Sequence, residues 1–384
     1  MIRKALADDP QQPRYIKTQN KEGWRFLMKV RAQPLAARPR RMPQPPNGPY
    51  DADWYVERPR EERELASCLN HPGRPAVICG PQGCGKSTLI AHALSSVGVT
   101  PPGENHRLIR ISLRALSLAH PESFEAMLQD FGRLLLESDA EDDARLQDLM
   151  AKLWRPGIDA KLKLKRLLRN HVLTPGRTIY LVLSDVDCLA PWRFQSTWFD
   201  MLRAWHDAEE MTALRLVLET AIPPRLFPLG GQSPLWTKVR RIQVPGLDTG
   251  QIAQMAELYG LRPSKNCGQE LVELVGGLAG LCRHALYQAA VQQVRLEDLL
   301  QEYRPDRREF GVFQEHLEDL QHWCEQKGAA ESRSILREAR QGVSLQAEQA
   351  WPLVRKGLLI ETETRGVYRL RCRLYQDFFT ERAR

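Results

Sequence analysis

Short apolar runs alternate with longer helical patterns through the middle of the chain. Leu recurs at helical spacing in residues 121–136 and 144–171, which predicts helices there. Five runs rich in Val, Ile and Leu are predicted to be strands, at residues 76–79, 108–113, 179–184, 214–219 and 241–244. This alternation predicts an α/β fold, in which helices cover both faces of a parallel sheet.

The strand signals stop after residue 244. Helical patterns follow at residues 249–259, 268–275 and 278–294, separated by breaks at Gly260, Pro263 and the pair Gly276 and Gly277. We therefore expect residues 50–247 to form the core and residues 248–300 to form a helical lid.

The last part of the chain, residues 301–384, contains both helical patterns and strand patterns. Helical patterns at 312–326, 330–340 and 345–356 are followed by two β-type runs around the turn Thr364-Arg365-Gly366, and then by a helical pattern at 374–379. Three helices followed by a hairpin predict a winged-helix domain.

The N-terminal segment has a different composition. Residues 1–41 hold eleven Lys and Arg against three acidic residues, so this arm carries the whole net charge of +8. The arm could bind nucleic acid, with its aromatic residues stacked on bases and its cations in contact with phosphates. It could instead dock on an acidic partner protein, or be a solvated tail. The Pro-rich stretch 34–49 reads as an extended linker, so residues 1–49 form the arm and linker.

Length and composition exclude several classes of protein. A chain of 384 residues with 42% hydrophobic content should hold two or three globular domains. No apolar stretch is long enough to span a membrane and the start lacks a signal-peptide core, so we expect a cytoplasmic protein. Eight cysteines without a CxxC pair suggest neither a zinc site nor a disulfide framework.

The strongest chemical signal is a full match to the P-loop pattern GxxxxGK[ST], placed between a predicted strand and a predicted helix. Its glycines let backbone N–H groups surround phosphates, Lys86 faces the β- and γ-phosphates, and the Ser87 hydroxyl ligates Mg²⁺. We therefore expect Mg-ATP as cofactor, and Lys86 as a catalytic residue. The residues expected to bind it here are Gly80, Pro81, Gln82, Gly83, Cys84, Gly85, Lys86, Ser87 and Thr88.

A P-loop ATPase also needs acidic residues at the end of a neighbouring strand, to hold Mg²⁺ and to polarise water. The apolar run 179–183 is followed by Ser184, Asp185, Val186 and Asp187. We expect Asp185 to be catalytic and to share the metal with Ser87, and Asp187 to cap the following turn. Only one acid stands where two are common, so weak hydrolysis is expected.

Weaker signals come from the fourth predicted strand and from the lid. Glu219 and Thr220 end that strand and are candidates for sensing the γ-phosphate. Arg283 lies near the start of a lid helix and could reach the nucleotide.

Two arginines and two aromatic residues carry weaker signals still. Arg240 and Arg241 could act in a second copy of the chain if it oligomerises, or could be ordinary surface residues. Trp205 and His206 have helical spacing and are expected to pack. No HExxH, GxSxG or paired Cys and His motif indicates another enzyme.

With these residues in view, the chain resembles bacterial AAA-like ATPase domains that are often grouped with STAND signalling ATPases. The resemblance runs from about residue 50 to the C-terminus. It rests on the P-loop, the stretches LVLSDVDCL and MLRAWHD, the sequence Val275-Gly-Gly-Leu, and the closing Arg373-Leu-Tyr-Gln-Asp-Phe-Phe379. It also rests on the residues ahead of the P-loop, namely Tyr55, Val56, Glu57, Arg58 and Pro59.

The resemblance implies that Tyr55, Val56, Arg58 and Pro59 lie near the adenine and that the winged helix packs on the core. Family members usually act as nucleotide-gated switches beside an effector or sensor, in signalling or anti-phage systems. The family commonly has Asp-Glu where this chain has Ser184-Asp185, which puts hydrolysis in question. No effector domain is recognisable in the sequence, so a separate partner protein and self-association are expected.

Two other functions stay open. The sequence from Gly280 to Leu286 is similar to that of origin-recognition and transposon ATPases, and a basic arm with a winged helix suits DNA. The chain could therefore be a regulator of transposition that forms ATP-dependent oligomers on DNA. It could also be a pseudo-ATPase scaffold in which the nucleotide is structural only.

Overall fold

The computed structural model describes residues 16–19, 23–26, 42–99, 105–119, 122–137, 143–227, 233–326 and 329–380. In the basic arm, β1 (Ile16–Gln19) and β2 (Gly23–Phe26) pair as an antiparallel hairpin. The base, phosphate and partner contacts expected of the arm stay predictions. No helix among the described residues is long and apolar enough to cross a membrane.

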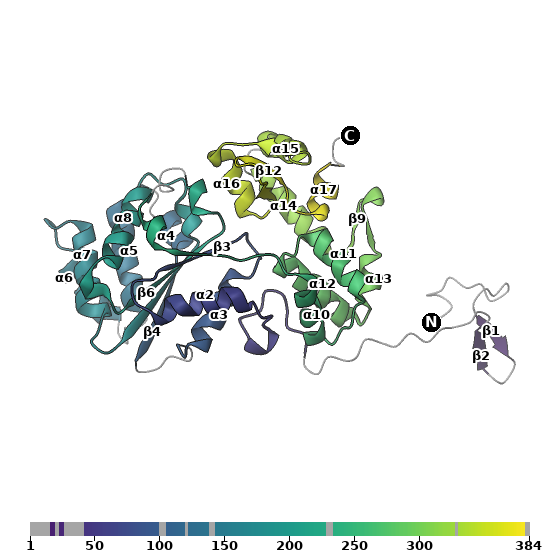
Figure 1. The fold of residues 1–384 in the computed structure, drawn as a ribbon, viewed down its shortest axis with the longest axis horizontal. Coiled ribbons are helices and arrows are strands. Elements are labelled where there is room, and N and C mark those ends of the chain that lie inside the picture. The colour runs from purple at the N-terminus through teal and green to yellow at the C-terminus, as the bar shows by residue number, and fades with distance from the viewer. Residues whose placement is uncertain are drawn as a thin grey trace.

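The core is built on a five-stranded parallel sheet, which confirms the predicted fold class (Figure 1). Its strands have the order β4-β5-β6-β3-β7. They are β3 (Ala76–Cys79), β4 (His106–Ser112), β5 (Thr178–Ser184), β6 (Leu214–Thr220) and β7 (Arg240–Gln243). All residues of β3 and the five inner residues of β5 are buried, because helices cover the sheet on both faces.

The strand that precedes the P-loop, β3, lies next to the edge strand β7. β3 pairs with β6 on one side and β7 on the other, so β6 separates it from β5. The carboxyl ends of the five parallel strands therefore bring the P-loop, Glu219 and Asp185 to one edge of the sheet.

Several helices surround the sheet. The P-loop helix α3 (Lys86–Ser96) packs against α2 (Pro59–Asn70), and α8 (Gln195–His206) buries Trp198 and Trp205. The other α-helices of the core are α4 (Leu113–Ala119), α5 (Phe124–Glu137), α6 (Asp143–Leu153), α7 (Ala160–Leu167) and α9 (Leu235–Lys238).

The helical pattern predicted across residues 144–171 is interrupted in the structure. Two helices, α6 and α7, occupy this stretch, and a π-helical turn (Leu168–Val172) follows. Pro156 has no N–H to continue the first helix, and Gly157 has a left-handed backbone with φ of 91°. The Asp159 side chain then caps α7 by accepting from the N–H groups of Lys161 and Leu162.

Four helices follow the sheet: α10 (Thr249–Leu258), α11 (Lys265–Val275), α12 (Ala279–Gln292) and α13 (Leu296–Leu300). Asp248 and Gln251 form a capping box at the start of α10, and Gly276 ends α11 with φ of 64°. The glycine pair predicted as a break thus separates α11 from α12.

The C-terminal region contains helices and a small antiparallel sheet. The helices are α14 (Gln314–Gln326), α15 (Ala329–Glu338), α16 (Ala347–Arg355) and α17 (Arg373–Thr380). The sheet has the order β10-β12-β11, from β10 (Val343–Ser344), β11 (Leu359–Glu361) and β12 (Val367–Leu370), and a hairpin of β8 (Tyr303–Arg304) and β9 (Glu309–Phe310) precedes them. These elements match the predicted order, while their identity as a winged helix stays a prediction.

The C-terminal region touches both other parts of the chain (Figure 1, yellow). An ion pair joins Arg225, in the core, to Glu361 on β11, and a longer one joins Glu270 on α11 to Arg373 on α17. The C-terminal region therefore contacts both the core and the lid.

Candidate nucleotide-binding site

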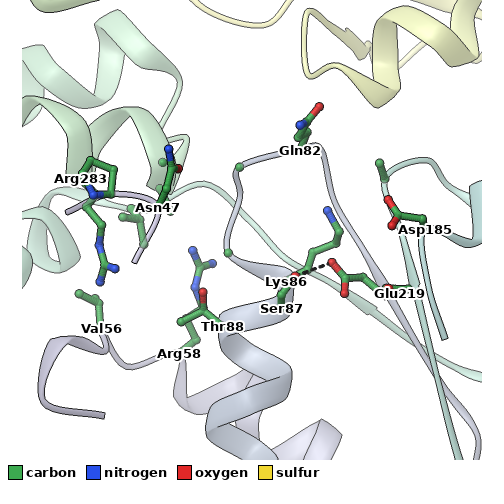
Figure 2. A pocket seen from close by; sticks show the side chains of 18 of the residues that line it. Asn47, Val56, Arg58, Gln82, Lys86, Ser87, Thr88, Asp185, Glu219 and Arg283 are labelled. Carbon is green, nitrogen blue, oxygen red and sulfur yellow. Dashed lines mark hydrogen bonds between the residues drawn. The ribbon is translucent and has the colours of Figure 1, made fainter. Parts of the chain in front are cut away.

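A cavity of about 430 Å³ lies at the carboxyl edge of the sheet, beside the P-loop. Figure 2 shows Asn47, Val56 and Arg283 on one side of the P-loop and Asp185 and Glu219 on the other. All parts of the chain from residue 42 onward contribute to the wall, since the lining also includes Pro46, Met255, Gly280 and Arg355.

The P-loop needs its glycines at the observed positions. Gly83 and Gly85 have φ of 79° and 96°, in the region that side chains other than glycine rarely adopt. A Cβ on Gly80 would lie 2.6 Å from the Cys84 Sγ. The loop can therefore turn its backbone N–H groups inward only because these residues have no side chain.

Lys86 begins α3 and is buried, with 8% of its surface exposed. Its Nζ donates to the carbonyl oxygens of Gly80 at 2.8 Å and Pro81 at 3.1 Å. These bonds hold the ammonium group under the loop, where a phosphate wrapped by the loop would meet it.

Ser87 is directed to Glu219 rather than to Asp185. Its Oγ donates to the Glu219 Oε1 at 2.8 Å (Figure 2). Burial raises the pKa of Glu219, although Lys86 and the Ser87 hydroxyl act in the opposite direction. The sequence suggested Glu219 as a sensor of the γ-phosphate; the structure places its carboxylate beside the expected metal ligand.

Asp185 follows β5 in a left-handed conformation, with φ of 56°. Its carboxylate accepts a hydrogen bond from the Ser112 Oγ at 2.8 Å and pairs with Arg114 at 3.1 Å. Asp185 does line the cavity, as expected. Its catalytic and metal-binding roles stay predictions, and Glu219 is a second candidate for both.

The expected capping role of Asp187 is wrong. Its side chain is only 2% exposed, accepts from the backbone N–H of Ala221 at 2.8 Å, and lies 2.6 Å from the Nε of Arg355. Asp187 therefore connects the loop after β5 to the loop after β6 and to the C-terminal region. An aspartate three positions after the end of a strand gives no sequence signal for such long-range contacts.

The segment ahead of α2 forms the opposite wall. Tyr55 stacks on His92 with ring centroids 3.9 Å apart, and its hydroxyl donates to Glu62. Arg58 is buried and donates to the carbonyl oxygens of Cys84 at 3.0 Å and Pro245 at 2.8 Å. Arg58 therefore ties the P-loop to the segment that leads into the lid.

Most residues expected to contact the nucleotide line the cavity. The expected residues on the wall are Tyr55, Val56, Arg58, Gln82, Gly83, Gly85, Lys86, Ser87, Thr88, Asp185 and Arg283. Pro59, Gly80, Pro81 and Cys84 belong to the same segments but are not part of the wall. Thr220 is buried, and its Oγ1 donates to the Ile222 carbonyl at 2.8 Å.

Residues 42–50, which we name the strap, are the first feature that sequence reasoning missed. The Gln44 carbonyl accepts from the Tyr259 hydroxyl at 2.8 Å, and Pro46 and Asn47 line the cavity. Arg283 donates to the Trp54 carbonyl at 2.6 Å and to the Gln44 Oε1 at 3.3 Å. The packed structure thus begins before Tyr50, and Arg283 lies on the strap side of the cavity.

Arg240 and Arg241 lie at the other edge of the sheet. Arg240 is level with Ala76, at the amino end of the P-loop strand, and pairs with Glu64. Arg241 donates to the Trp236 carbonyl at 3.0 Å. A role in a neighbouring copy stays a prediction, since neither arginine lines the cavity of its own chain.

The residues at the site suit magnesium bound together with a nucleotide. Mg²⁺ is typically held by one or two carboxylates, a hydroxyl, water and phosphate oxygens. Ser87 and Glu219 supply a hydroxyl and a carboxylate in contact, with Asp185 on the same wall. Among the residues that the structure describes, no cluster of three His, Cys, Asp or Glu could hold a metal ion by itself.

Comparison with known proteins adds independent information. The sequence model of the AAA-like domain matches residues 44–381. A Walker-type ATPase of Pyrococcus abyssi has a similar structure, with a TM-score of 0.54, 14% identity, and coverage of 85% of this chain and 96% of that one. This likeness establishes the fold. Among curated proteins, none matches this sequence.

Two of the further structures that match are less similar to this chain. Cdc6p of Pyrobaculum aerophilum has a TM-score of 0.43 and 15% identity, covering 87% of this chain and 99% of that one. A STAND protein with a tetratricopeptide repeat sensor from Pyrococcus horikoshii has a TM-score of 0.39 and 16% identity, covering 89% and 44%.

Proposed function

The chain belongs to the family of AAA-like domains, and from that membership we propose that it binds Mg-ATP and acts as a nucleotide-dependent switch for a partner protein. The P-loop, matched in both sequence and geometry, supports nucleotide binding. The switch is supported by one observation above all: core, strap, lid and C-terminal region all line a single cavity.

Such a cavity makes the arrangement of the parts sensitive to its ligand. Gly280, at the start of α12, donates its N–H to the Gly83 carbonyl of the P-loop at 2.8 Å. From the C-terminal region, the Arg355 carbonyl accepts from the Gln82 N–H at 3.3 Å. Suppose that the parts can take two arrangements and that a ligand binds one arrangement more tightly than the other. The ligand then shifts the equilibrium toward the arrangement it prefers, by no more than the difference between its binding free energies for the two.

The chain's own residues have distinct roles in this proposal. Lys86 neutralises phosphate charge, and Ser87 with Glu219 holds Mg²⁺, which supplies further positive charge at the phosphates. Glu219 or Asp185 orients a water molecule for hydrolysis. Because Asp185 is already paired with Arg114, we expect slow turnover rather than rapid ATPase activity.

Hydrogen exchange of the full chain tests the switch. We expect a non-hydrolysable ATP analogue with Mg²⁺ to change protection in α16 and α12 relative to ADP, as well as in the P-loop itself. Lys86→Ala is the matched control, since it removes the phosphate contact from the same chain. Protection that changes in the P-loop alone, with α12 and α16 unaffected, would refute the switch.

A second function is supported by the charge distribution. Residues 1–41 carry the entire net charge of the chain, which favours a regulator that binds DNA. Binding to random duplex DNA should then weaken steeply with salt and disappear when the arm's Lys and Arg residues are replaced by Gln. Absence of DNA binding at low salt would refute this second function and leave the arm as a protein-docking segment or a solvated tail.

A further inference from the structure

The end of α16 lies against the P-loop. The Gln82 N–H, at the tip of the loop, donates to the carbonyl of Arg355, the last residue of this helix. Two residues later, a Cβ on Gly357 would lie 3.2 Å from the Cβ of Pro81. Little space therefore separates the end of α16 from the P-loop.

The side chain of Arg355 extends from this contact to the wall of the cavity. Its Nε lies 2.6 Å from the Asp187 Oδ2, and its Nη2 donates to the Cys188 Sγ at 2.9 Å. Asp187 is buried and is itself held by the Ala221 N–H. The guanidinium is thus fixed from one side by a loop of the core.

The opposite side of the guanidinium remains open. Within the part of the chain that the structure describes, Nη1 makes no hydrogen bond, and Arg355 lines the same cavity as Lys86 and Glu219. A planar guanidinium suits phosphate oxygens, and its fixed geometry leaves less entropy to lose on binding.

From this geometry we propose that Arg355 contacts the terminal phosphate of a bound nucleoside triphosphate, with Asp187 as its positioning residue. The inference rests on the proposed function, because it assumes that the phosphates lie between the P-loop and Glu219. In this proposal the third phosphate is recognised by the C-terminal region, and not by Arg283 of the lid.

Two consequences follow. The contact exists with ATP and is lost with ADP, so Arg355 sets the preference between the two nucleotides. The same contact anchors α16 to the P-loop, so the number of phosphates controls how firmly the C-terminal region is docked.

Calorimetry on the full chain tests the inference, with a non-hydrolysable ATP analogue and ADP, each in Mg²⁺. Arg355→Ala should weaken binding of the analogue about tenfold or more, because it removes a charged hydrogen bond, while ADP affinity stays the same. Arg225→Ala is the matched control. It also breaks an ion pair between core and C-terminal region, but Arg225 is not on the cavity wall, so both affinities should be unchanged.

Two further variants separate contact from packing. Arg355→Lys retains the charge but cannot hold Asp187 and reach a phosphate together, so the preference for the triphosphate should fall in a protein that still folds. Asp187→Asn should weaken the same preference by loosening the guanidinium. Equal losses for both nucleotides, or no loss in either Arg355 variant, would overturn the inference.

The result also distinguishes this inference from the proposed function. A wild-type chain that binds neither nucleotide would refute the function itself. Nucleotide binding that depends on Lys86, together with an ATP to ADP ratio that is insensitive to Arg355, would refute only the role of Arg355.

Discussion

Glu219→Gln should raise the stability of the fold and, at the same time, weaken Mg²⁺-dependent nucleotide binding. The Glu219 carboxylate accepts from Ser87 at 2.8 Å, and burial raises its pKa above the ordinary value of 4.5. An acid with a raised pKa in the folded state favours folding only below its ordinary pKa, and that stability is lost as pH rises through the folded-state pKa. At pH 7, above the ordinary pKa, this raised pKa disfavours the folded state, so replacing the carboxylate by an amide should raise the melting temperature.

The effect on binding has the opposite sign. Gln keeps an oxygen for the Ser87 hydroxyl but loses the charge that attracts Mg²⁺. A hydrogen bond or contact to a charged group contributes about 1.5–3 kcal/mol, which corresponds to a loss of roughly tenfold to a hundredfold in Mg²⁺-dependent nucleotide affinity. Binding in EDTA should change little, since there the carboxylate has no metal to hold.

Nucleotide titrations with and without Mg²⁺, together with melting curves, check both parts of this prediction. Asp185→Asn is the matched control, because Asp185 lies on the same wall but pairs with Arg114. A larger loss of Mg²⁺-dependent affinity in Asp185→Asn than in Glu219→Gln would show that Asp185 holds the metal. Our assignment of Glu219 would then be wrong.

Three further predictions concern the P-loop, its anchor and the C-terminal region. Gly85→Ala should cost about 1–3 kcal/mol of stability and weaken nucleotide binding, because the φ of Gly85 is 96° and alanine is strained there. Denaturant unfolding and calorimetry measure the two effects, and a variant with unchanged stability and affinity would contradict the prediction. Arg58→Met should lower the free energy of unfolding by about 2–4 kcal/mol, because the carbonyls of Cys84 and Pro245 lose their buried donor. Arg60→Met, on the exposed side of α2, should have little effect on it. Burial lowers the pKa of His316 from 6.5 to about 4, so between these two pH values the unfolded chain binds a proton that the folded chain does not. The free energy of unfolding should therefore fall as the pH drops through this window, by up to about 3 kcal/mol. His316→Gln should flatten this pH dependence, as measured by the melting temperature.

Local patterns were sufficient to predict the sheet and the P-loop. Apolar runs placed the five strands to within about two residues, because buried parallel strands need continuous hydrophobic sequence. The P-loop could be recognised because its glycines and Lys86 act within one short segment. The helical break at Pro156 was missed because the Leu periodicity continues on both sides of it.

The partners of the acidic residues could not be predicted in the same way. Asp185 follows β5 and Glu219 lies near the end of β6. Only the strand order places Glu219, on the neighbour of β3, beside Ser87. Arg355 lies 168 positions after Asp187, and nothing in the sequence around either residue indicates the ion pair. Contacts of this kind depend on how whole regions pack, which a local pattern does not report.

The central claim is that the P-loop binds Mg-ATP, and calorimetry of the full chain tests it most directly. Lys86→Ala should lower the affinity for Mg-ATP by roughly a hundredfold or more, since a buried ammonium that faces the phosphates is lost. Lys161→Ala, at an exposed position on α7, should leave the affinity unchanged. Equal Mg-ATP affinity in wild type and Lys86→Ala would contradict the account.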